Sequence, residues 1–310
     1  MAEQYCSQVL DSFLKLVRHS RSSILAFCVL QFTFSLVATL GNLLVIRALI
    51  KASTIPANVR KMFISLAFSD LAVGLLPQLM DAIIYAVVWK TTSRGDNLAF
   101  LCPTVLSVLY HFMYLLVATS FLNVIFIAFD RLLAVSLHLR YQELVTARRV
   151  TTVLVSVWII SCVLAIQFIF FPNEIEMVAA VIGLIGYVLT NMAYVRIYKV
   201  VKYHQNQIYS QNQLQNAQTR EALRQRKSAY NSLFVSVVFL ACYFPLFPCT
   251  ILYMANTSEI SFLIAQFASF FLICLNSSLN PLVYCWRYRE IRQIVKNTMK
   301  KIIHMNENIT

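Results

Sequence analysis

Seven apolar stretches, each long enough to cross a lipid bilayer as a helix, constrain the fold of this chain more than any other sequence feature. A helix needs roughly 20 apolar residues to span the hydrocarbon core. The stretches cover residues 24–50, 62–89, 100–133, 150–171, 177–203, 228–255 and 261–286. Only 13% of the 310 residues are charged and 59% are hydrophobic, which excludes a soluble domain and a disordered chain. The sequence predicts an all-α membrane protein.

The basic residues predict how the bundle is oriented. Of the 26 Lys and Arg residues, 21 lie in the connections after spans one, three and five and in the C-terminal tail. By the positive-inside rule those segments face the cytoplasm, so the N-terminus lies outside. In a soluble chain a net charge of +13 would suggest nucleic acid, but here it reports topology and no nucleic-acid partner is expected.

The orientation divides the chain into three parts. Residues 1–23 form an extracellular segment, residues 24–286 the seven-helix bundle, and residues 287–310 a cytoplasmic tail. The tail is predicted to be an amphipathic helix on the anionic inner leaflet, because apolar residues recur every three to four positions among Lys and Arg. The apolar set is Tyr288, Ile291, Ile294, Val295, Met299, Ile302 and Ile303.

Polar and helix-breaking residues recur at defined depths within the spans. The sequence Asn280-Pro281-Leu282-Val283-Tyr284 puts a helix breaker near the end of the last span, where lipid offers no water to satisfy the freed backbone. Five further motifs occur in the other spans: Gly41-Asn42, Leu66 to Asp70, Asp130-Arg131-Leu132, Trp158, and Phe239 with Cys242-Tyr243-Phe244-Pro245. In this order and register they resemble the rhodopsin-like (class A) G-protein-coupled receptors. Tyr194 to Tyr198 resembles the melanocortin, adenosine and cannabinoid branch.

Asp70 lies at mid-membrane, where a carboxylate is costly unless it is paired, protonated or bound to a metal. One interpretation is a structural residue bonded to Asn42 and Asn280. The resemblance implies a second, an allosteric sodium ion that holds the inactive state. Its expected ligands are Asp70, Ser120, Asn276, Ser277 and Asn280.

Asp130 and Arg131 lie where span three meets the cytoplasm, and in an arbitrary membrane protein they would be an ordinary interfacial charge pair. The resemblance implies that Arg131 is held by Asp130 at rest and contacts a heterotrimeric G protein when released, while Tyr194 and Tyr284 bridge behind it. Gln225 stands where many relatives carry an acid that locks this arginine, so no strong ionic lock is expected.

Span six is predicted to act as the moving part, because Pro245 removes a backbone hydrogen bond and kinks the helix. Phe239 lies below the kink with Phe121 as its expected partner, and plain packing is an equally open interpretation for both. Tyr243 replaces the family's usual tryptophan. Gly186 replaces a proline in span five, so a weak bulge or none is expected there.

The family's usual outer disulfide cannot form, because the connection between spans four and five, residues 172–176, contains no cysteine. Cys6 lies in the outer segment and outside any predicted helix. A bridge from Cys6 to Cys102 is therefore one candidate in that oxidising compartment, with Cys249 as the competing partner.

The ligand is an extracellular peptide, lipid or amphiphile that the sequence does not identify. The resemblance implies the pocket residues Asp81, Tyr110, Met113, Tyr114, Val117, Leu246, Phe247, Thr250, Phe270 and Cys274. Met113 replaces the aspartate that binds monoamines, Thr250 the asparagine that adenosine receptors need, and Cys274 the retinal lysine. Asp81, Glu174, Glu176 and Glu259 would form an acidic rim.

An ion channel or pump and a membrane hydrolase are the two alternatives to a plasma-membrane receptor. A seven-helix ion channel or pump needs a retinal lysine or a file of ionisable residues, whereas only Asp70 and Asp81 are membrane-deep acids. A membrane hydrolase needs paired catalytic groups, and His111 is the only histidine in a span. No enzymatic activity and no cofactor beyond sodium are expected.

Overall fold

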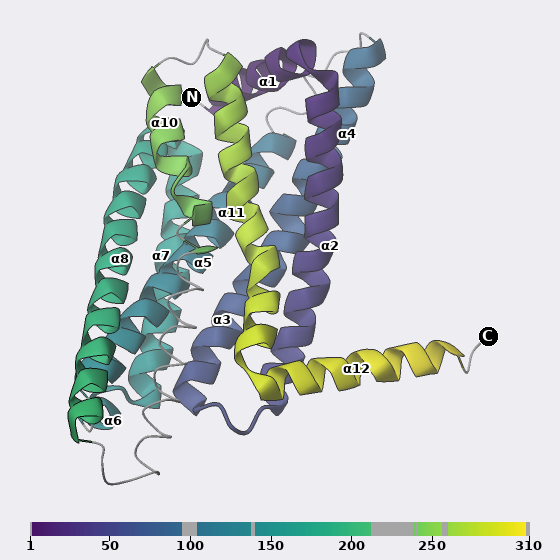
Figure 1. The fold of residues 1–310 in the computed structure, drawn as a ribbon. Coiled ribbons are helices and arrows are strands. Elements are labelled where there is room, and N and C mark those ends of the chain that lie inside the picture. Colours follow the sequence, from purple (N-terminus) through teal and green to yellow (C-terminus); the bar gives the residue numbers. More distant parts are fainter. Residues whose placement is uncertain are drawn as a thin grey trace.

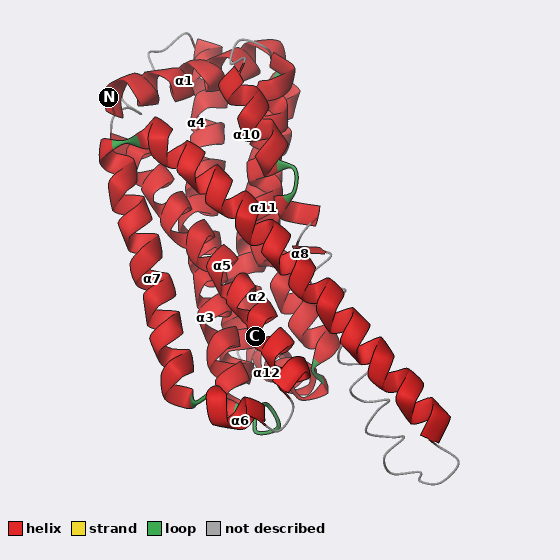
Figure 2. Ribbon diagram, turned by 90° about the vertical axis from the view of Figure 1, so that its left-hand side faces the viewer, coloured by secondary structure: helices red, strands yellow, loops and turns green. Residues whose placement is uncertain are grey.

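The computed structural model describes residues 2–94, 104–137, 140–211, 238–239, 241–255 and 260–307. Within these residues all the regular structure is helical, and the helices are joined by short turns (Figure 2). The predicted all-α class is confirmed.

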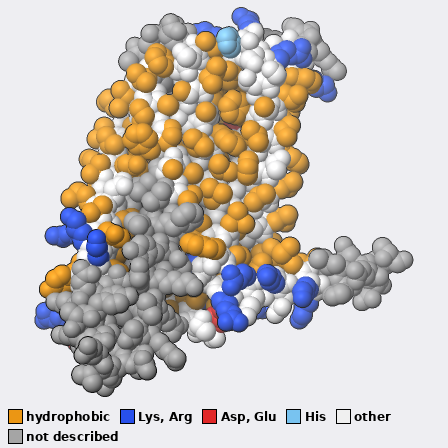
Figure 3. Space-filling view, viewed as in Figure 1, with side chains coloured by type: hydrophobic (Ala, Val, Ile, Leu, Met, Phe, Trp, Pro, Cys, Tyr) orange, Lys and Arg blue, Asp and Glu red, His pale blue; other side chains and the backbone are white. Residues whose placement is uncertain are grey.

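Six helical segments are long and apolar enough to cross a membrane. They are α2 (Arg21–Lys51), α3 (Ala57–Val73) continued by η1 and α4 (Leu79–Arg94), α5 (Thr104–Leu137), α7 (Ala147–Phe170), α8 (Pro172–Gln211) and α11 (Ile260–Arg287). The shorter α10 (Leu246–Ala255) is the outer part of the sixth predicted span and stands among them (Figure 1). The chain is thus a multi-pass membrane protein, and a belt of exposed apolar side chains covers its middle (Figure 3).

A π-helical turn in span two, η1 (Gly74–Gln78), was not expected from the sequence. Pro77 lies inside it, and a wider turn accommodates a residue that lacks a backbone N–H. Ser35 of α2 donates to the Gly74 carbonyl at 2.7 Å, which satisfies one backbone oxygen of the turn. The extra residue rotates the outer half, α4, relative to α3.

Span six is interrupted where proline predicted it. Residues 241–243 are helical, Phe244 and Pro245 form a turn, and α10 begins at Leu246. The Pro245 carbonyl accepts from the Cys249 backbone N–H at 3.2 Å, so the helix resumes directly above the break. Span five, by contrast, runs without interruption through Gly186.

Two glycines allow neighbouring helices to approach closely. A Cβ added at Gly41 of α2 would lie 2.9 Å from Cγ of Pro281 in α11. A Cβ added at Gly186 of α8 would lie 2.7 Å from Cδ1 of Ile125 in α5. Both distances are shorter than carbon atoms tolerate, but the Pro281 ring is rigid whereas Ile125 Cδ1 is the end of a flexible side chain, so the contact at Gly41 is the one that requires glycine. Across α3, α5 and α7, Trp158 donates to Ser65 at 3.2 Å and Ser65 to Asn123 at 3.1 Å.

The outer segment is a helix, α1 (Ala2–His19), which lies across the outer end of the bundle (Figure 1). Its apolar face is buried, with Phe13, Leu16 and Val17 at most 2% exposed, and it contacts α2, α4 and α11. The expectation that Cys6 lies outside a helix was wrong. An apolar residue every three to four positions in this stretch was the signal that could have revealed the helix.

At the opposite end, α12 (Arg289–Glu307) turns away from α11 and runs roughly perpendicular to the bundle (Figure 1). Ile291 is fully buried against the bundle, while Met299 and Ile302 are exposed, as an amphipathic helix on a membrane surface requires. Glu290 accepts from the Ser53 and Thr54 backbone N–H groups at 2.8 and 3.1 Å. This carboxylate joins α12 to the turn between α2 and α3.

Candidate functional site

Asp70 of α3 is fully buried at the centre of the bundle and is held by polar side chains from two other helices. Ser120 of α5 and Ser277 of α11 donate to Oδ1 at 2.9 and 2.8 Å. Asn280 donates to Oδ2 at 2.6 Å. Asn42, expected beside this carboxylate, instead donates to the Ser277 carbonyl at 3.0 Å. The aspartate therefore ties α3, α5 and α11 together.

The residues around Asp70 fit a small hard cation. Among the described residues the one ion pair joins Arg131 and Asp130, so Asp70 has no basic partner there. A buried carboxylate of this kind requires a proton or a cation. Two neighbouring hydroxyls and two amides supply further oxygens, the ligand type that hard cations prefer. Asn276 is 2% exposed, and its Nδ2, a donor that cannot bind a cation, has no partner among the described residues, so only its Oδ1 could serve as a ligand.

An aromatic cluster lies at the break in span six. The Phe121 ring of α5 lies 5.9 Å from the Phe239 ring and 5.1 Å from the Tyr243 ring, measured between centroids. Tyr243 also lies within hydrogen-bonding reach of Ser120, which is itself bonded to Asp70. Tyr243 thus connects the residues above the break to the Asp70 cluster.

Arg131 is paired with Asp130 at the cytoplasmic end of α5. Its Nε donates to Asp130 Oδ2 at 3.0 Å and Nη2 donates to the same oxygen. Tyr141, in the short helix α6 (Tyr141–Leu144), donates to Asp130 Oδ1 at 2.6 Å. Burial and then this bond to Asp130 raise the pKa of Tyr141, so its hydroxyl remains a donor at neutral pH. Sequence reasoning missed Tyr141, whose place in a connection gave no signal.

A small cavity of about 40 Å³ lies at the same end. It brings together the residues predicted to act in activation: Arg131, Tyr194, Phe239, Asn280 and Tyr284. The Tyr284 hydroxyl is buried and has no hydrogen-bond partner. A buried unpaired hydroxyl costs on the order of 1–3 kcal/mol, so this conformation leaves Tyr284 with a bond still to be gained. Gln225 lies outside the described residues.

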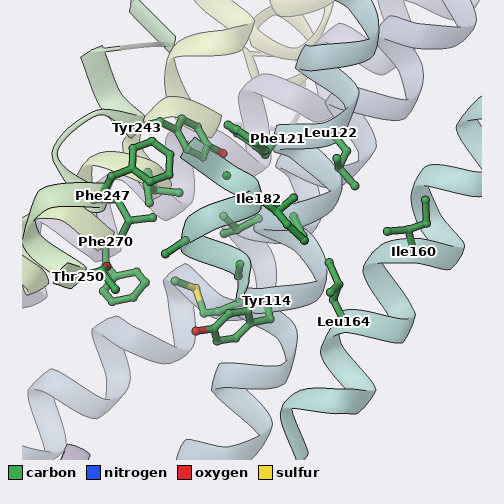
Figure 4. A pocket seen from close by; sticks show the side chains of 18 residues that line it. Tyr114, Phe121, Leu122, Ile160, Leu164, Ile182, Tyr243, Phe247, Thr250 and Phe270 are labelled. Atoms are coloured by element: carbon green, nitrogen blue, oxygen red, sulfur yellow. The ribbon is translucent and has the colours of Figure 1, made fainter. Parts of the chain in front are cut away.

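A second cavity, of about 220 Å³, lies in the outer half of the bundle (Figure 4). Seven of the predicted pocket residues line it: Met113, Tyr114, Val117, Leu246, Phe247, Thr250 and Phe270. Phe121 and Tyr243 line it too, so the cavity reaches the aromatic cluster. The helices α7 and α8 contribute a wall that the sequence did not predict, including Ile160 and Ile182.

Two predicted pocket residues lie elsewhere. Asp81 accepts from Gln31 Nε2 of α2 at 3.3 Å and is not among the lining residues, because the π-turn changes the direction of the side chains beyond it. Cys274 is fully buried in the packing between helices. The Tyr110 side chain lies outside the described residues. Of the predicted acidic rim, Asp81 bonds to Gln31 of α2 and Glu174 is exposed, while the side chains of Glu176 and Glu259 lie outside the described residues, so the rim stays a prediction.

The predicted bridge between Cys6 and Cys102 stays a prediction. The side chains of Cys6 and Cys102 lie outside the described residues. Cys249, the competing partner, is a free thiol, as are Cys28, Cys162, Cys242, Cys274 and Cys285.

Comparison with known proteins agrees with the motifs. The sequence profile described as "7 transmembrane receptor (rhodopsin family)" matches residues 41–179. Melanocortin receptor 5 of Rattus norvegicus is 25% identical over 278 residues, covering 87% of this chain and 82% of the relative. Melanocortin receptor 4 of Danio rerio is 25% identical over 269 residues, with coverages of 85% and 81%.

Adenosine receptor A2b of Gallus gallus is 26% identical over 322 residues and 89% of each chain. The relatives are receptors rather than enzymes. The matched residues include the helices that carry Asp70 and Arg131. The chain is therefore similar over most of its length to rhodopsin-like (class A) G-protein-coupled receptors, with melanocortin and adenosine receptors among its relatives.

Proposed function

We propose that this chain is a plasma-membrane receptor that binds an extracellular ligand in the outer cavity and activates a heterotrimeric G protein on the cytoplasmic side. The observation that carries the proposal is a continuous series of contacts between the two cavities. Phe121 and Tyr243 line the outer cavity, and Phe239, which lines the inner one, packs against both rings. The N-terminus is extracellular and α12 rests on the inner leaflet.

The resting conformation is stabilised from both sides of the break in span six. Asp130 and Tyr141 hold Arg131 at the cytoplasmic end, and the Asp70 cluster holds α3, α5 and α11 together above it. A ligand that displaces Tyr243 perturbs Phe239 directly, since their ring centroids are 4.4 Å apart. Moving the lower part of span six away from α5 opens the inner cavity, exposes Arg131 to the G protein and lets the Tyr284 hydroxyl gain a partner.

A sodium ion is proposed as an allosteric ligand of the resting state. Asp70, Ser120, Asn276, Ser277 and Asn280 would hold it, and its charge would compensate the buried carboxylate. The residues that would hold the ion come from three helices, α3, α5 and α11, which meet at Asp70. Tyr243 of span six lies within hydrogen-bonding reach of Ser120, so moving span six would disturb one of the proposed ligands, and an ion bound there and the active conformation would disfavour each other.

Nucleotide exchange tests the function. The full chain in lipid nanodiscs is mixed with purified heterotrimeric G proteins, and uptake of a non-hydrolysable GTP analogue is measured. We expect exchange above that of empty nanodiscs, lost in Arg131→Ala and retained in Arg148→Ala, an exposed arginine at the cytoplasmic end of α7. Exchange by Arg131→Ala at the parent rate would refute the proposed role of this arginine.

A further inference from the structure

The outer cavity is apolar to a degree that restricts its ligand. Among the described residues that line it none is charged, and their polar side-chain atoms are the hydroxyls of Tyr114, Tyr243 and Thr250. An ammonium, carboxylate or phosphate group placed there would lose its hydration without gaining an ionic partner. A hydrocarbon chain loses nothing on entering and removes apolar surface from water. The wall therefore selects an uncharged, largely apolar ligand.

The cavity has a side that faces the bilayer. Ile160 of α7 and Ile182 of α8 both line it, yet they are 51% and 49% exposed on the outside of the bundle. Leu164 and Leu122 stand beside them (Figure 4). Phe171 alone separates α7 from α8, so the connection between these two helices is too short to lie over the gap between them. Among the described residues, Ile160 and Ile182 combine a place in the cavity wall with a half-exposed side chain.

The outer end of the bundle, in contrast, carries α1 packed across it (Figure 1). The Phe13 ring lies 5.5 Å from the Tyr85 ring of α4 and 4.8 Å from the Phe267 ring of α11, and α1 also contacts α5 and α8. A ligand arriving from water would have to displace this buried apolar face. A ligand dissolved in the bilayer would instead meet apolar side chains of α7 and α8, including Ile160 and Ile182.

The Gln266 side chain lies behind the cavity wall and offers a hydrogen-bond acceptor to the polar head group of an uncharged ligand. Gln266 Nε2 donates to Thr250 Oγ1 at 3.3 Å, while Gln266 Oε1 is buried without a partner in a residue that is 6% exposed. Thr250 lines the cavity, so a hydroxyl or amide group bound beside it lies one residue from this unsatisfied acceptor. An uncharged head with a donor matches this pair, and a carboxylate does not.

From these four observations we propose that the ligand is an uncharged amphiphile with a long hydrocarbon part, which reaches the cavity from the bilayer between α7 and α8. The proposal rests on the proposed function in one respect, that the outer cavity is the ligand site. It adds the chemical class of the ligand, its route, and the residues that control the route.

Photo-crosslinking tests the ligand class. Nanodiscs containing the full chain are incubated with one of two probes that share an acyl chain bearing a diazirine and an alkyne. One probe is a monoacylglycerol and the other is the free fatty acid, so they differ in the charge of the head. We expect saturable labelling of peptides from α5, α8 and α10 by the monoacylglycerol, at on the order of tenfold lower concentration than by the acid. Equal labelling by both, or labelling confined to the outer surface of the helices, would overturn the proposed class.

Tryptophan substitutions test the route. Ile160→Trp and Ile182→Trp narrow the gap and should slow the initial labelling of the cavity on the order of tenfold, since access then requires a rearrangement. Ile159→Trp and Val181→Trp are matched controls, because these neighbours are 58% and 54% exposed but do not line the cavity. Phe13→Ala loosens the cover and should leave the rate unchanged. Faster labelling in Phe13→Ala with no effect at Ile160 and Ile182 would place the route at the outer mouth and overturn the proposal.

Measuring labelling and nucleotide exchange on the same samples separates this inference from the proposed function. Arg131→Ala should label as the parent does while losing exchange. If labelling is slower in Ile160→Trp and Ile182→Trp but no nucleotide exchange is detected, the ligand inference is supported and the receptor function is contradicted. Exchange stimulated by a water-soluble peptide or nucleoside, equal in Ile160→Trp, Ile182→Trp and the parent, supports the receptor function and overturns the ligand inference.

Discussion

Removing the hydroxyl of Tyr141 tests how firmly the resting state holds Arg131. Tyr141 donates to Asp130 Oδ1 at 2.6 Å, and the other oxygen of the same carboxylate accepts from Arg131. The carboxylate is 1% exposed, so the two donors fix its orientation. In Tyr141→Phe the carboxylate keeps the guanidinium but loses the bond that connects it to α6.

The expected change in ligand-free nucleotide exchange follows from the strength of the hydrogen bond between Tyr141 and Asp130. A hydrogen bond to a charged group contributes about 1.5–3 kcal/mol, and Tyr141 is only half-buried, so the lower end applies. A loss of about 1.4 kcal/mol from the resting state alone is a factor of ten in the population of the active state, as long as that state is the minor one. Tyr141→Phe should therefore raise ligand-free nucleotide exchange on the order of tenfold.

Exchange is measured in nanodiscs with purified G protein, at receptor concentrations matched by quantitative immunoblot. Glu143→Gln, an exposed change in the same short helix, is the control and should exchange as the parent does. Asp130→Asn should raise exchange further, and the double variant should gain less than the sum of the two single effects, because both remove the same contact. A parent-like rate in Tyr141→Phe, with unchanged expression, would show that α6 does not restrain Arg131.

Three further predictions concern other contacts. Sodium chloride should lower ligand-free exchange relative to choline chloride, and Asp70→Asn should remove that difference; equal sodium sensitivity in both would rule out the site. Gly41→Ala should lower the thermal unfolding midpoint, because its Cβ would lie 2.9 Å from the rigid Pro281 ring and overpacking costs about 1–3 kcal/mol; a midpoint at or above the parent's would contradict this. Bonds from the Thr54 side chain and the Ser53 backbone lower the pKa of Glu290 from 4.5 to about 2. A lowered folded-state pKa gives stability that is present above the unfolded pKa and lost as pH falls through the folded one. Glu290→Gln should therefore lower the unfolding midpoint at neutral pH and approach the parent as pH falls from about 4.5 to about 2.

Several elements could be predicted because their causes are local. Pro245 interrupts span six wherever the helix lies, and the spacing of Ile291 and Ile294 makes α12 amphipathic without reference to any partner. The polar residues around Asp70 were found because they stand at family positions, and three of them donate to its carboxylate. Asn42 was placed beside Asp70 as well, but its amide reaches the Ser277 carbonyl instead.

Other elements escaped prediction because they depend on how helices meet. Pro77 is visible in the sequence, but the π-turn around it also needs Ser35 from α2 to satisfy the Gly74 carbonyl. Beyond that turn Asp81 bonds to Gln31 of α2 and is not among the described residues that line the cavity. The contribution of Ile160 to the cavity wall depends on the crossing of α7 past α8, and nothing in an apolar span marks one isoleucine among many.

The sequence by itself predicted the apolar spans, the helical tail and the polar residues within the spans, and the orientation in the membrane stays a prediction. These follow from hydrophobic length, charge and residue type, which act within a few turns of one helix. Only the tertiary structure decided that α1 packs across the end of the bundle, that Tyr141 joins Asp130, and that Ile182 of α8 lines the cavity. Each of these depends on side chains from separate helices arriving at one place, and the packing of large and small residues that brings them together is a property of the whole bundle.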